Sequence, residues 1–506
     1  MISVSLETLP NEVILNIFAH LTVKDLGRCA QVSKNFCSLA YDKSVWTKIL
    51  VTSGIVPHKL LEQALSRGAK YLGLSNLSFA STVEPNFPPT NQVEYLALSS
   101  SLMDEKYFGE LILSCHNLKK LSVNDGDWKS DDLIKGILQN SNSLRVLDLS
   151  GCSKLNRQDM KSIISSCLKL TEANFDHMTI WDSIFLNLTP SIEKLSLSGT
   201  AIGINDITEI LTRCKKITDL DLTWAHLYLD LHTKFNTNIK FPKKTQLESL
   251  YLRGFNIGFN LLEMLILSCE NSLQVLDISD CNMTPQAIEL VVSRCLHLTA
   301  VDFSGEKHVA FICKNMTPNI EKVSLSSTDV SNDDIKTLVS RCNKIKELDI
   351  SQTAIDIDMV VDEIILHLSI TLEKLCLPIT NPARFSKFDH CSLFKFGSMP
   401  RLRHIWSQVM YGMDKIVDLW EKQFPNVVLS SNSFCPIITH PNIAKSMAME
   451  ERIWEIPCEG IELSDIQDDD SNVNKIHDSI SEARELSSPR TFIHQRLRDL
   501  TFGTAE

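Results

Sequence analysis

The sequence predicts an α/β solenoid, in which short parallel strands line a concave face and helices cover the convex face, with a small helical module in front. Three observations lead to this prediction. A pattern of apolar-x-x-apolar-x-apolar recurs about every 25 residues, cysteines recur in register with it, and apolar residues near the start of the chain have helical spacing. One repeat cannot bury its apolar face alone, so neighbouring repeats must stack.

The repeats make up most of the chain. Segments such as VLDLS and ELDIS alternate like short strands, and the segments that follow, such as DDIKTLVSRC, have the spacing of a helix. This is the spacing of leucine-rich repeats, and RGAKYLGLSNL around Leu72 is expected to be a degenerate first repeat. The central apolar residues are Leu96, Leu121, Leu147, Ala173, Leu195, Leu220, Leu250, Leu276, Val301, Val323, Leu348, Leu375 and Ile405.

A longer duplication lies inside the array. SLRVLDLSGC at Ser143 returns as SLQVLDISDC at Ser272, and residues 188–224 match residues 316–352 at 17 of 37 positions. We interpret this as the duplication of a block of about five repeats, since such arrays grow by copying whole units.

The cysteines follow the same period. Cys115, Cys167, Cys214, Cys295 and Cys342 each lie six residues before a central apolar residue. A small residue recurring at the end of a helix indicates core packing, and we expect the cysteines to be reduced. No C-x-x-C pair is present, so no metal site is predicted.

Charge and hydropathy exclude several classes of protein. The net charge of −12 disfavours a nucleic-acid partner, because phosphate binding requires a basic face. No apolar run approaches a membrane span, and the first residues do not form a secretory signal. The sequence lacks a phosphate-binding loop, a dinucleotide fingerprint and the common hydrolase motifs, so we expect neither a cofactor nor a catalytic role.

The helical module has an apolar stripe at Val13, Ile14, Ile17, Phe18 and Leu21, as an amphipathic helix would. About forty residues bury too little surface to be robust alone, so part of the module should face the first repeats or a partner. One alternative is a helix that simply caps the solenoid.

The module resembles the F-box, through LP-x-E-x-x-x-x-IF-x-x-L, then DL, QVSK-x-F and LA-x-D-x-x-VW. The resemblance implies docking on the Skp adaptor of a cullin–RING ubiquitin ligase. The residues carried over as adaptor-facing or supporting are Leu9, Pro10, Ile14, Phe18, Leu21, Leu26, Val32 and Trp46.

More of the chain resembles the S-phase kinase-associated F-box receptors. HKLLEQALSRGAKYLGLSNLSF resembles that family's linker and first repeat, and FPNVVLSSNSFCPIITHPNIAKSMAMEERIWEI resembles its tail, although a plain C-terminal cap would also explain that segment. The resemblance implies a substrate receptor of an SCF ligase, with Skp, cullin and RING partners. Tail contacts carried over are Phe434, Ile437, Pro441, Ile443, Ile453 and Trp454.

The family's clients are phosphorylated proteins such as cyclin-dependent-kinase inhibitors, read together with a Cks accessory protein and degraded by the proteasome at the G1/S transition. The resemblance therefore implies a nuclear and cytoplasmic protein. The sequence departs from the family in its greater number of repeats, in an acidic extension after the tail, and in lacking the family's long N-terminal extension. A receptor for unrelated substrates and a scaffold outside ubiquitin transfer remain alternatives.

Residues between the buried positions of each strand are expected to face the concave side. They form an acidic stripe suited to a basic partner, although Asp is also usual in LDLS motifs. The candidate binding residues are Asp148, Asp221, Tyr251, Arg253, Asp277, Asp302, Asp349 and Trp406. No Lys or Arg cluster follows the strands, which agrees with a phosphate pocket supplied by an accessory protein.

Five segments are predicted. They are an F-box (1–50), a linker with the degenerate repeat (51–92), the solenoid (93–428), a tail packing on the concave face (429–458) and an acidic, disordered extension (459–506).

Overall fold

The structure is a computed structural model of the chain. The chain divides into two units, residues 1–456 and 457–506, and every described residue belongs to the first. The structure describes residues 9–51, 54–56, 58–75, 77–79, 86–88, 91–99, 105–124, 131–178, 184–227, 241–378, 390–407 and 420–430.

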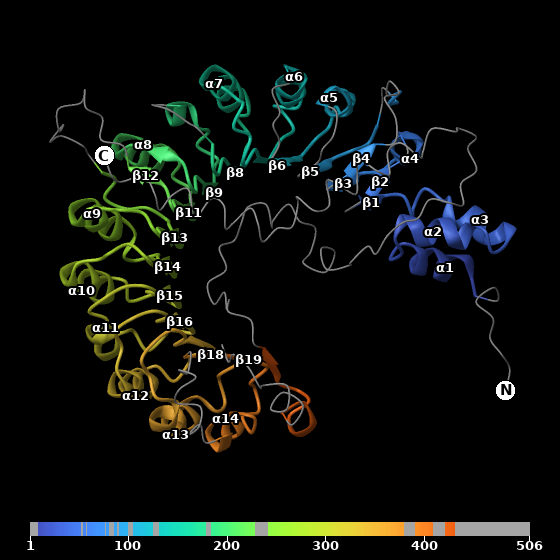
Figure 1. Cartoon of the computed structure of the whole chain (residues 1–506). Helices are drawn as coiled ribbons and strands as arrows, with labels where there is room; N and C mark the ends of the chain where they lie inside the picture. Colours follow the sequence, from blue (N-terminus) through green and yellow to red (C-terminus); the bar gives the residue numbers. More distant parts are fainter. Residues whose placement is uncertain are drawn as a thin grey trace, which may run out of the picture. The chain divides into compact units, whose positions relative to one another are not determined.

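Three short helices form the first module, drawn in dark blue in Figure 1. They are α1 (Asn11–Phe18), α2 (Val23–Ala30) and α3 (Lys34–Ala40). Side-chain caps set two of the starts: the Thr22 hydroxyl accepts the Asp25 N–H, and the Ser33 hydroxyl accepts the Phe36 N–H. Phe18 meets Phe36 edge to face at 5.5 Å inside the module.

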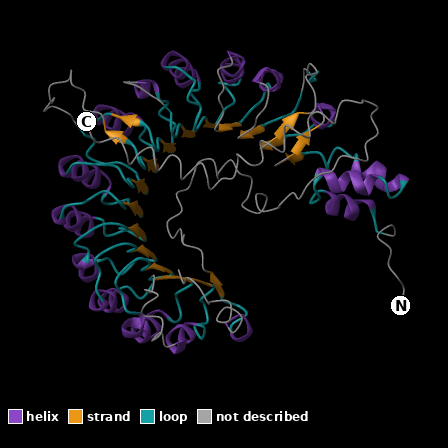
Figure 2. Cartoon of the chain, viewed as in Figure 1, coloured by secondary structure: helices purple, strands orange, loops and turns teal. Residues whose placement is uncertain are grey.

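Sixteen strands of the described chain form one parallel sheet. Figures 1 and 2 show these strands on the inner side of a curved stack, with helices on the outer side. In spatial order they are β1 (Lys48–Val51), β3 (Tyr71–Ser75), β5 (Tyr95–Ser99), β6 (Lys120–Asn124), β7 (Val146–Asp148), β8 (Glu172–Asn174), β9 (Lys194–Ser196), β11 (Asp219–Asp221), β13 (Ser249–Tyr251), β14 (Val275–Asp277), β15 (Ala300–Asp302), β16 (Lys322–Ser324), β17 (Glu347–Asp349), β18 (Lys374–Leu377), β19 (His404–Ser407) and β20 (Val428–Ser430).

Helices behind the strands complete the repeats. They are α4 (His58–Ser66), α5 (Glu105–Ser114), α6 (Asp131–Gln139), α7 (Arg157–Ser166), the 3-10 helix η2 (Ile184–Asn187), α8 (Ile204–Arg213), α9 (Phe259–Cys269), α10 (Pro285–Arg294), α11 (Ala310–Asn315), α12 (Asn332–Arg341), α13 (Ile357–Leu368) and α14 (His390–Phe396). Two small parallel pairs flank the sheet: β2 (Gly54–Val56) with β4 (Leu77–Phe79), and β10 (Ala201–Ile202) with β12 (His226–Leu227).

The strand register confirms all thirteen predicted central residues and the degenerate repeat. Leu72 pairs with Leu96, and the central residues pair in turn along the sheet to Ile405. The sheet also extends past both predicted boundaries, because Ile49 pairs with Leu72 at one end and Leu429 pairs with Ile405 at the other. β1 therefore belongs to the sheet and not to the helical module, and β20 belongs to the sheet and not to the tail.

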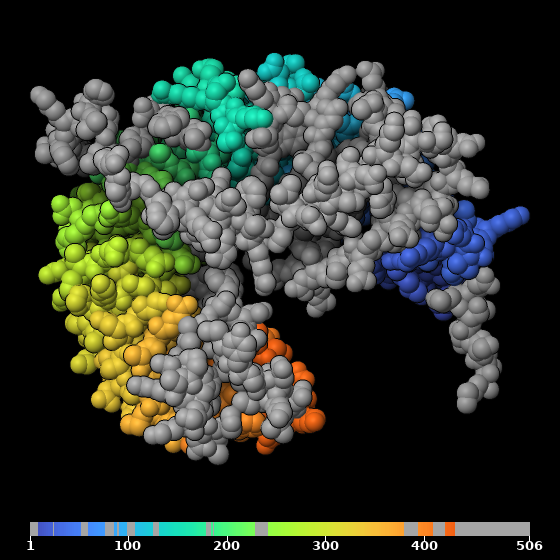
Figure 3. All heavy atoms as spheres, viewed as in Figure 1, coloured from blue at the N-terminus to red at the C-terminus, as the bar shows by residue number. Residues whose placement is uncertain are grey.

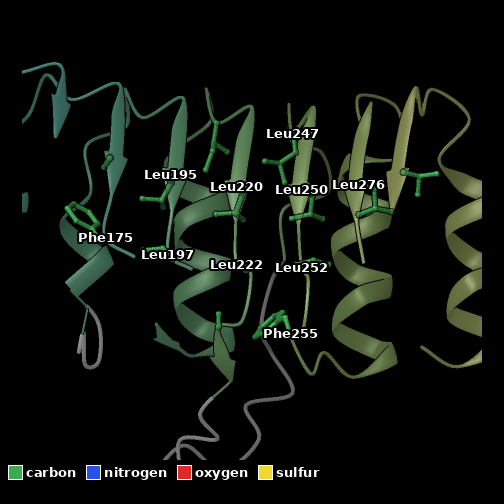
Figure 4. Close-up of a cluster of buried hydrophobic side chains, with 14 of the residues drawn as sticks. Phe175, Leu195, Leu197, Leu220, Leu222, Leu247, Leu250, Leu252, Phe255 and Leu276 are labelled. Atoms are coloured by element: carbon green, nitrogen blue, oxygen red, sulfur yellow. The ribbon is translucent and has the colours of Figure 1, made fainter. Parts of the chain in front are cut away.

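The core is continuous from the helical module to the last strands. Central leucines and the apolar residues beside them point from the strands toward the helices, as Figure 4 shows for Leu195, Leu220, Leu250 and Leu276. Each of these four leucines is buried. Because each repeat contributes one layer, the apolar faces are covered only by neighbouring repeats, as the periodicity predicted.

The recurrent cysteines cap helices. Cys167, Cys214, Cys295 and Cys342 are buried residues directly after α7, α8, α10 and α12. Burial raises the pKa of their thiols, which keeps them protonated and unreactive. Cys376 contradicts the expectation of uniformly reduced cysteines, because it is disulfide-bonded. It lies within strand β18 and not at the end of a helix, so the packing argument for the others does not extend to it.

The sequence duplication is also visible in side-chain contacts. Arg213 Nε donates to the carbonyl of Leu188, and Arg341 Nε donates to the carbonyl of Met316. These are equivalent positions of the two blocks.

No helix in the described residues is long and apolar enough to cross a bilayer, and the described residues contain no group of three potential metal ligands.

Candidate partner-binding surfaces

The aspartates of the concave strands serve the backbone of their own repeats. Asp148 Oδ1 accepts the N–H of Ser150 at 3.0 Å, two residues further on. Equivalent bonds run from Thr223 to Asp221, Ser279 to Asp277, Ser304 to Asp302 and Ser351 to Asp349. The carboxylate therefore satisfies an N–H where the chain leaves the strand, which explains why these repeats favour Asp there.

This use of the carboxylates corrects the predicted acidic stripe. Asp148, Asp277, Asp349 and Tyr251 are buried, because strands one repeat apart press equivalent side chains against each other. They are structural residues and not an accessible binding surface. Among the other candidates, Asp221, Asp302, Arg253 and Trp406 remain half-buried.

Burial also weakens the acidity of the stripe. It raises the pKa of Asp148, Asp302 and Asp349, and Asp277 beside Asp302 contributes in the same direction. Asp176, at the edge of the stripe, has its pKa raised to about 7 by burial, against the opposing hydrogen bond from the Ser196 hydroxyl. The concave face thus carries less negative charge at neutral pH than the sequence suggests.

A column of left-handed residues follows the strands. Four residues after each central position the backbone has positive φ in nine consecutive repeats. The column reads Gly151, His177, Gly199, Trp224, Gly254, Asp280, Gly305, Ser327 and Gln352. The N–H of each of the first eight donates to a carbonyl of the next repeat, as from Trp224 to Arg253 at 2.6 Å, so the column extends the parallel ladder beyond the strands.

Glycines in this column make room for their neighbours. A side chain on Gly199 would meet the His177 ring, and a side chain on Gly254 would lie 2.1 Å from Cε3 of Trp224. Asp280 occupies the corresponding space over Gly305. Large side chains therefore lie on the glycine of the following repeat, which holds them at the edge of the sheet.

One part of this column forms an exposed cluster, which we call the rim cluster: Trp224, Arg253 and Asp280. Trp224 is 48% exposed, and the Arg253 guanidinium lies 6.0 Å from its ring centroid. Arg253 Nη2 donates to Asp280 Oδ2 at 3.1 Å, while its Nε is buried and has no hydrogen-bond partner. An exposed indole held on glycine, beside a partly exposed guanidinium, has the chemistry of an interface anchor.

The sequence prediction included Arg253 but missed Trp224 and Asp280. The missing signal was the position four residues after the central apolar residue, where glycine alternates with larger side chains from Gly151 to Gly305. The positive φ that explains this alternation appears only in the structure.

In the helical module, burial separates two kinds of predicted residue. Ile14, Phe18, Leu26 and Trp46 lie in the interior, so of the two roles predicted for them, adaptor-facing or supporting, burial leaves the supporting one. Trp46 is fixed there because its Nε1–H donates to the carbonyl of Ala40 at 2.9 Å.

The surface of the module carries other apolar side chains. Val13 and Ile17, one turn apart on α1, are 43% and 39% exposed, and Val32 is 64% exposed. Of the remaining predicted residues, Leu9 and Leu21 are half-buried and Pro10 is exposed. Figure 3 shows this module as a dark blue surface at the start of the array. Val13 and Ile17 were recognised in the sequence as part of the stripe but were not among the predicted contacts.

Two further predicted features can be placed. Trp406 on β19 stacks on His404 at 5.3 Å. Burial and nearby Lys374 lower the pKa of His404, so this histidine is neutral at physiological pH. The predicted tail contacts Phe434, Ile437, Pro441, Ile443, Ile453 and Trp454 lie outside the described residues.

Both the helical module and the repeat region of the chain match models of known protein families. Residues 6–52 match the family model F-box-like, and residues 59–235 match the model of the SKP2 LRR domain. The human F-box/WD repeat-containing protein 8 is 45% identical over 49 residues, which are 10% of this chain and 8% of that protein. The F-box/LRR-repeat protein 5 of Danio rerio is 27% identical over 229 residues, which are 43% of this chain and 29% of that protein.

An internalin structure from Listeria monocytogenes aligns with 65% of this chain and 89% of its own, at a TM-score of 0.37 and 18% identity. The alignments cover less than a third of the length of each of the two curated relatives.

A helical F-box-like module directly before a leucine-rich-repeat sheet defines this chain as an F-box/leucine-rich-repeat protein. Within that class it is similar to SKP2, whose repeat-domain model matches the linker and the first repeats.

Proposed function

We propose that this chain is the substrate-recognition subunit of an SCF-type cullin–RING ubiquitin ligase. The F-box would bind the Skp adaptor, and through it the cullin and RING subunits, while the repeats hold a protein to be ubiquitinated and degraded. The observation that carries the proposal is the pairing of an F-box-like module that exposes Val13, Ile17 and Val32 with a continuous repeat sheet.

The exposed residues of the module fit a subunit interface. Val13 and Ile17 share one face of α1, and the buried Phe18 of the same helix packs edge to face on Phe36 of α3. A rigid apolar patch with a packed support loses little conformational freedom when a partner covers it. This division of roles assigns direct contact to the exposed residues and support to the buried ones.

The adaptor test uses surface substitutions that leave the core intact. Val13→Asp with Ile17→Asp should abolish capture of the purified Skp adaptor, because two carboxylates would be buried at the interface. Leu366→Asp is the matched control, since Leu366 is 71% exposed on α13, far along the array. Undiminished capture by the double variant would refute the proposed adaptor surface.

The repeat surface supplies the second half of the proposal. We place client recognition at the rim cluster, where Trp224 offers an aromatic face and the Arg253 side chain is 37% exposed. By the family resemblance, the client would be a phosphorylated protein such as a cyclin-dependent-kinase inhibitor, bound with a Cks accessory protein in the nucleus and cytoplasm. The catalytic groups for ubiquitin transfer would belong to other subunits, and this chain would contribute proximity.

Two measurements separate the alternatives. Binding of a purified Cks protein that weakens in Trp224→Ala supports the SKP2-like mode, whereas no Cks binding favours a receptor for unrelated substrates. Ubiquitin transfer by the complex captured on this chain tests the ligase role itself. A complex that holds the Skp adaptor but no cullin, and that transfers no ubiquitin, would favour a scaffold.

A further inference from the structure

A basic pocket lies where the helical module meets the first repeats. Its volume is about 270 Å³, and its walls come from the segment before β1, the end of α4 and the entry to β3. The lining residues are Lys43, Ser44, Thr47, Ser66, Arg67, Gly68, Lys70 and Gln92. Three of them are cationic and none carries a carboxylate, in a protein whose net charge is −12.

Arg67 is the fixed element of this pocket. Its guanidinium lies 4.7 Å from the Tyr41 ring and 4.6 Å from the Trp46 ring, and those two rings are stacked on each other. Nη1 also donates to Gln63 Oε1 at 3.2 Å. A guanidinium held by aromatic rings keeps other N–H groups available and loses little entropy when an oxyanion binds.

The other two cations, both lysines, form no ion pair with a described residue. Lys43 and Lys70 are exposed, and the ion pairs between described residues include neither of them nor Arg67. The nearby carboxylate of Asp42 accepts both the N–H and the hydroxyl of Ser44, and these bonds lower its pKa. Asp42 is therefore engaged with Ser44 and does not neutralise the pocket by pairing with a cation.

The hydroxyls of the pocket already donate within the chain. Ser66 Oγ donates to the carbonyl of Glu62 at 2.6 Å, and Thr47 Oγ1 donates to the carbonyl of Ser44 at 3.1 Å. Hydrogen bonds to a ligand must then come from the three cations and the Gln92 amide. A donor set of one guanidinium and two ammonium groups matches a doubly charged anion with three terminal oxygens better than it matches a single carboxylate.

We propose that this pocket binds a phosphate monoester dianion. Arg67 would hold two of its oxygens, with Lys43 and Lys70 balancing the charge. The phosphate could be carried by a phosphorylated side chain of a protein partner or by a small phosphorylated solute, and the two sources share this chemistry. The site is separate from the rim cluster, and its existence does not depend on the proposed ligase role.

Titration calorimetry on the full chain tests the proposal with three probes. They are inorganic phosphate, the peptide Ala-Ala-phosphoserine-Ala-Ala and the same peptide with unmodified serine. We expect the phosphopeptide or inorganic phosphate to bind, the unmodified peptide not to bind, and affinity to fall as salt is raised. Tighter binding of the phosphopeptide identifies a protein source, and equal binding identifies a small solute.

Variants locate the binding in the pocket. Lys43→Gln with Lys70→Gln should weaken phosphate binding about tenfold, because two charge-assisted contacts are lost. Arg67→Lys should weaken it similarly by removing the bidentate fork. Lys215→Gln with Lys216→Gln, two exposed lysines of another repeat, is the matched control. Equal affinity in the wild type and the Lys43/Lys70 variant overturns the proposal. So does the absence of binding by both phosphate probes at 10 mM, a dissociation constant that corresponds to a binding free energy of about 2.7 kcal/mol.

Discussion

Replacing Gly254 by alanine tests the packing of the rim cluster most directly. Gly254 has φ +64°, and an added Cβ would lie 2.1 Å from Cε3 and 2.2 Å from Cζ3 of Trp224. Two costs follow. The left-handed backbone costs a residue with a Cβ roughly 1–2 kcal/mol, and the indole must move by more than 1 Å to reach ordinary contact distance.

The size of the second cost depends on the freedom of Trp224. Because its side chain is 48% exposed, the indole can swing outward instead of forcing the backbone apart. We therefore expect a further loss of only about 1 kcal/mol, from the packing of the ring on Gly254. The total destabilisation by Gly254→Ala should be about 2–3 kcal/mol.

A double-mutant cycle separates the two costs. Gly254→Ala is measured by guanidinium unfolding in the wild type and in Trp224→Ala, where the collision cannot occur. The cost should fall to the backbone contribution alone in the Trp224→Ala background. Gly258→Ala is the control, since φ there is −68° and no atom lies within 4 Å of its added Cβ. An equal cost in both backgrounds would refute the packing of Trp224 on Gly254.

Two further outcomes are expected. Gly27→Ala in α2 should stabilise the helical module by about 0.5–1 kcal/mol. Gly27 lies inside a helix, and no atom lies within 4 Å of a Cβ added there. A lower unfolding midpoint in this variant would contradict the expectation. Asp176 has a folded pKa raised to about 7 from 3.8, so its contribution to stability is complete below pH 4 and is lost as the pH rises through 7. Asp176→Asn should therefore flatten the fall in unfolding midpoint between pH 4 and 7, and an unchanged profile would show that another group titrates.

Much of the architecture could be predicted because apolar residues recur at a spacing of about 25 residues. Leu147, Leu220 and Leu276 each lie at the centre of a strand whose register agrees with the repeat count. The ends of the sheet were less predictable. Ile49 and Leu429 occupy single strands whose neighbouring segments lack the full repeat, so local pattern did not distinguish them from the flanking segments.

The candidate sites were predicted less well, because burial depends on neighbours from other repeats. Phe18 and Val32 are both apolar residues in one motif, yet Phe18 packs inside against Phe36 and Val32 faces outward. In the segment LDIS, Asp277 is expected to be a surface charge. In the structure it is buried, and its carboxylate accepts the Ser279 N–H. Lys43, Arg67 and Lys70 are 27 residues apart at most and form a cluster only because β1 and β3 pair.

The sequence by itself determined the solenoid, its strand centres and its F-box-like module, because periodic apolar residues admit only one way of burying every repeat. Tertiary structure alone decided which polar and aromatic groups remain available to partners. Stacking brings residues about 25 positions apart into contact, as Trp224 lies on Gly254. Exposure is therefore a property of neighbouring repeats and not of any one of them.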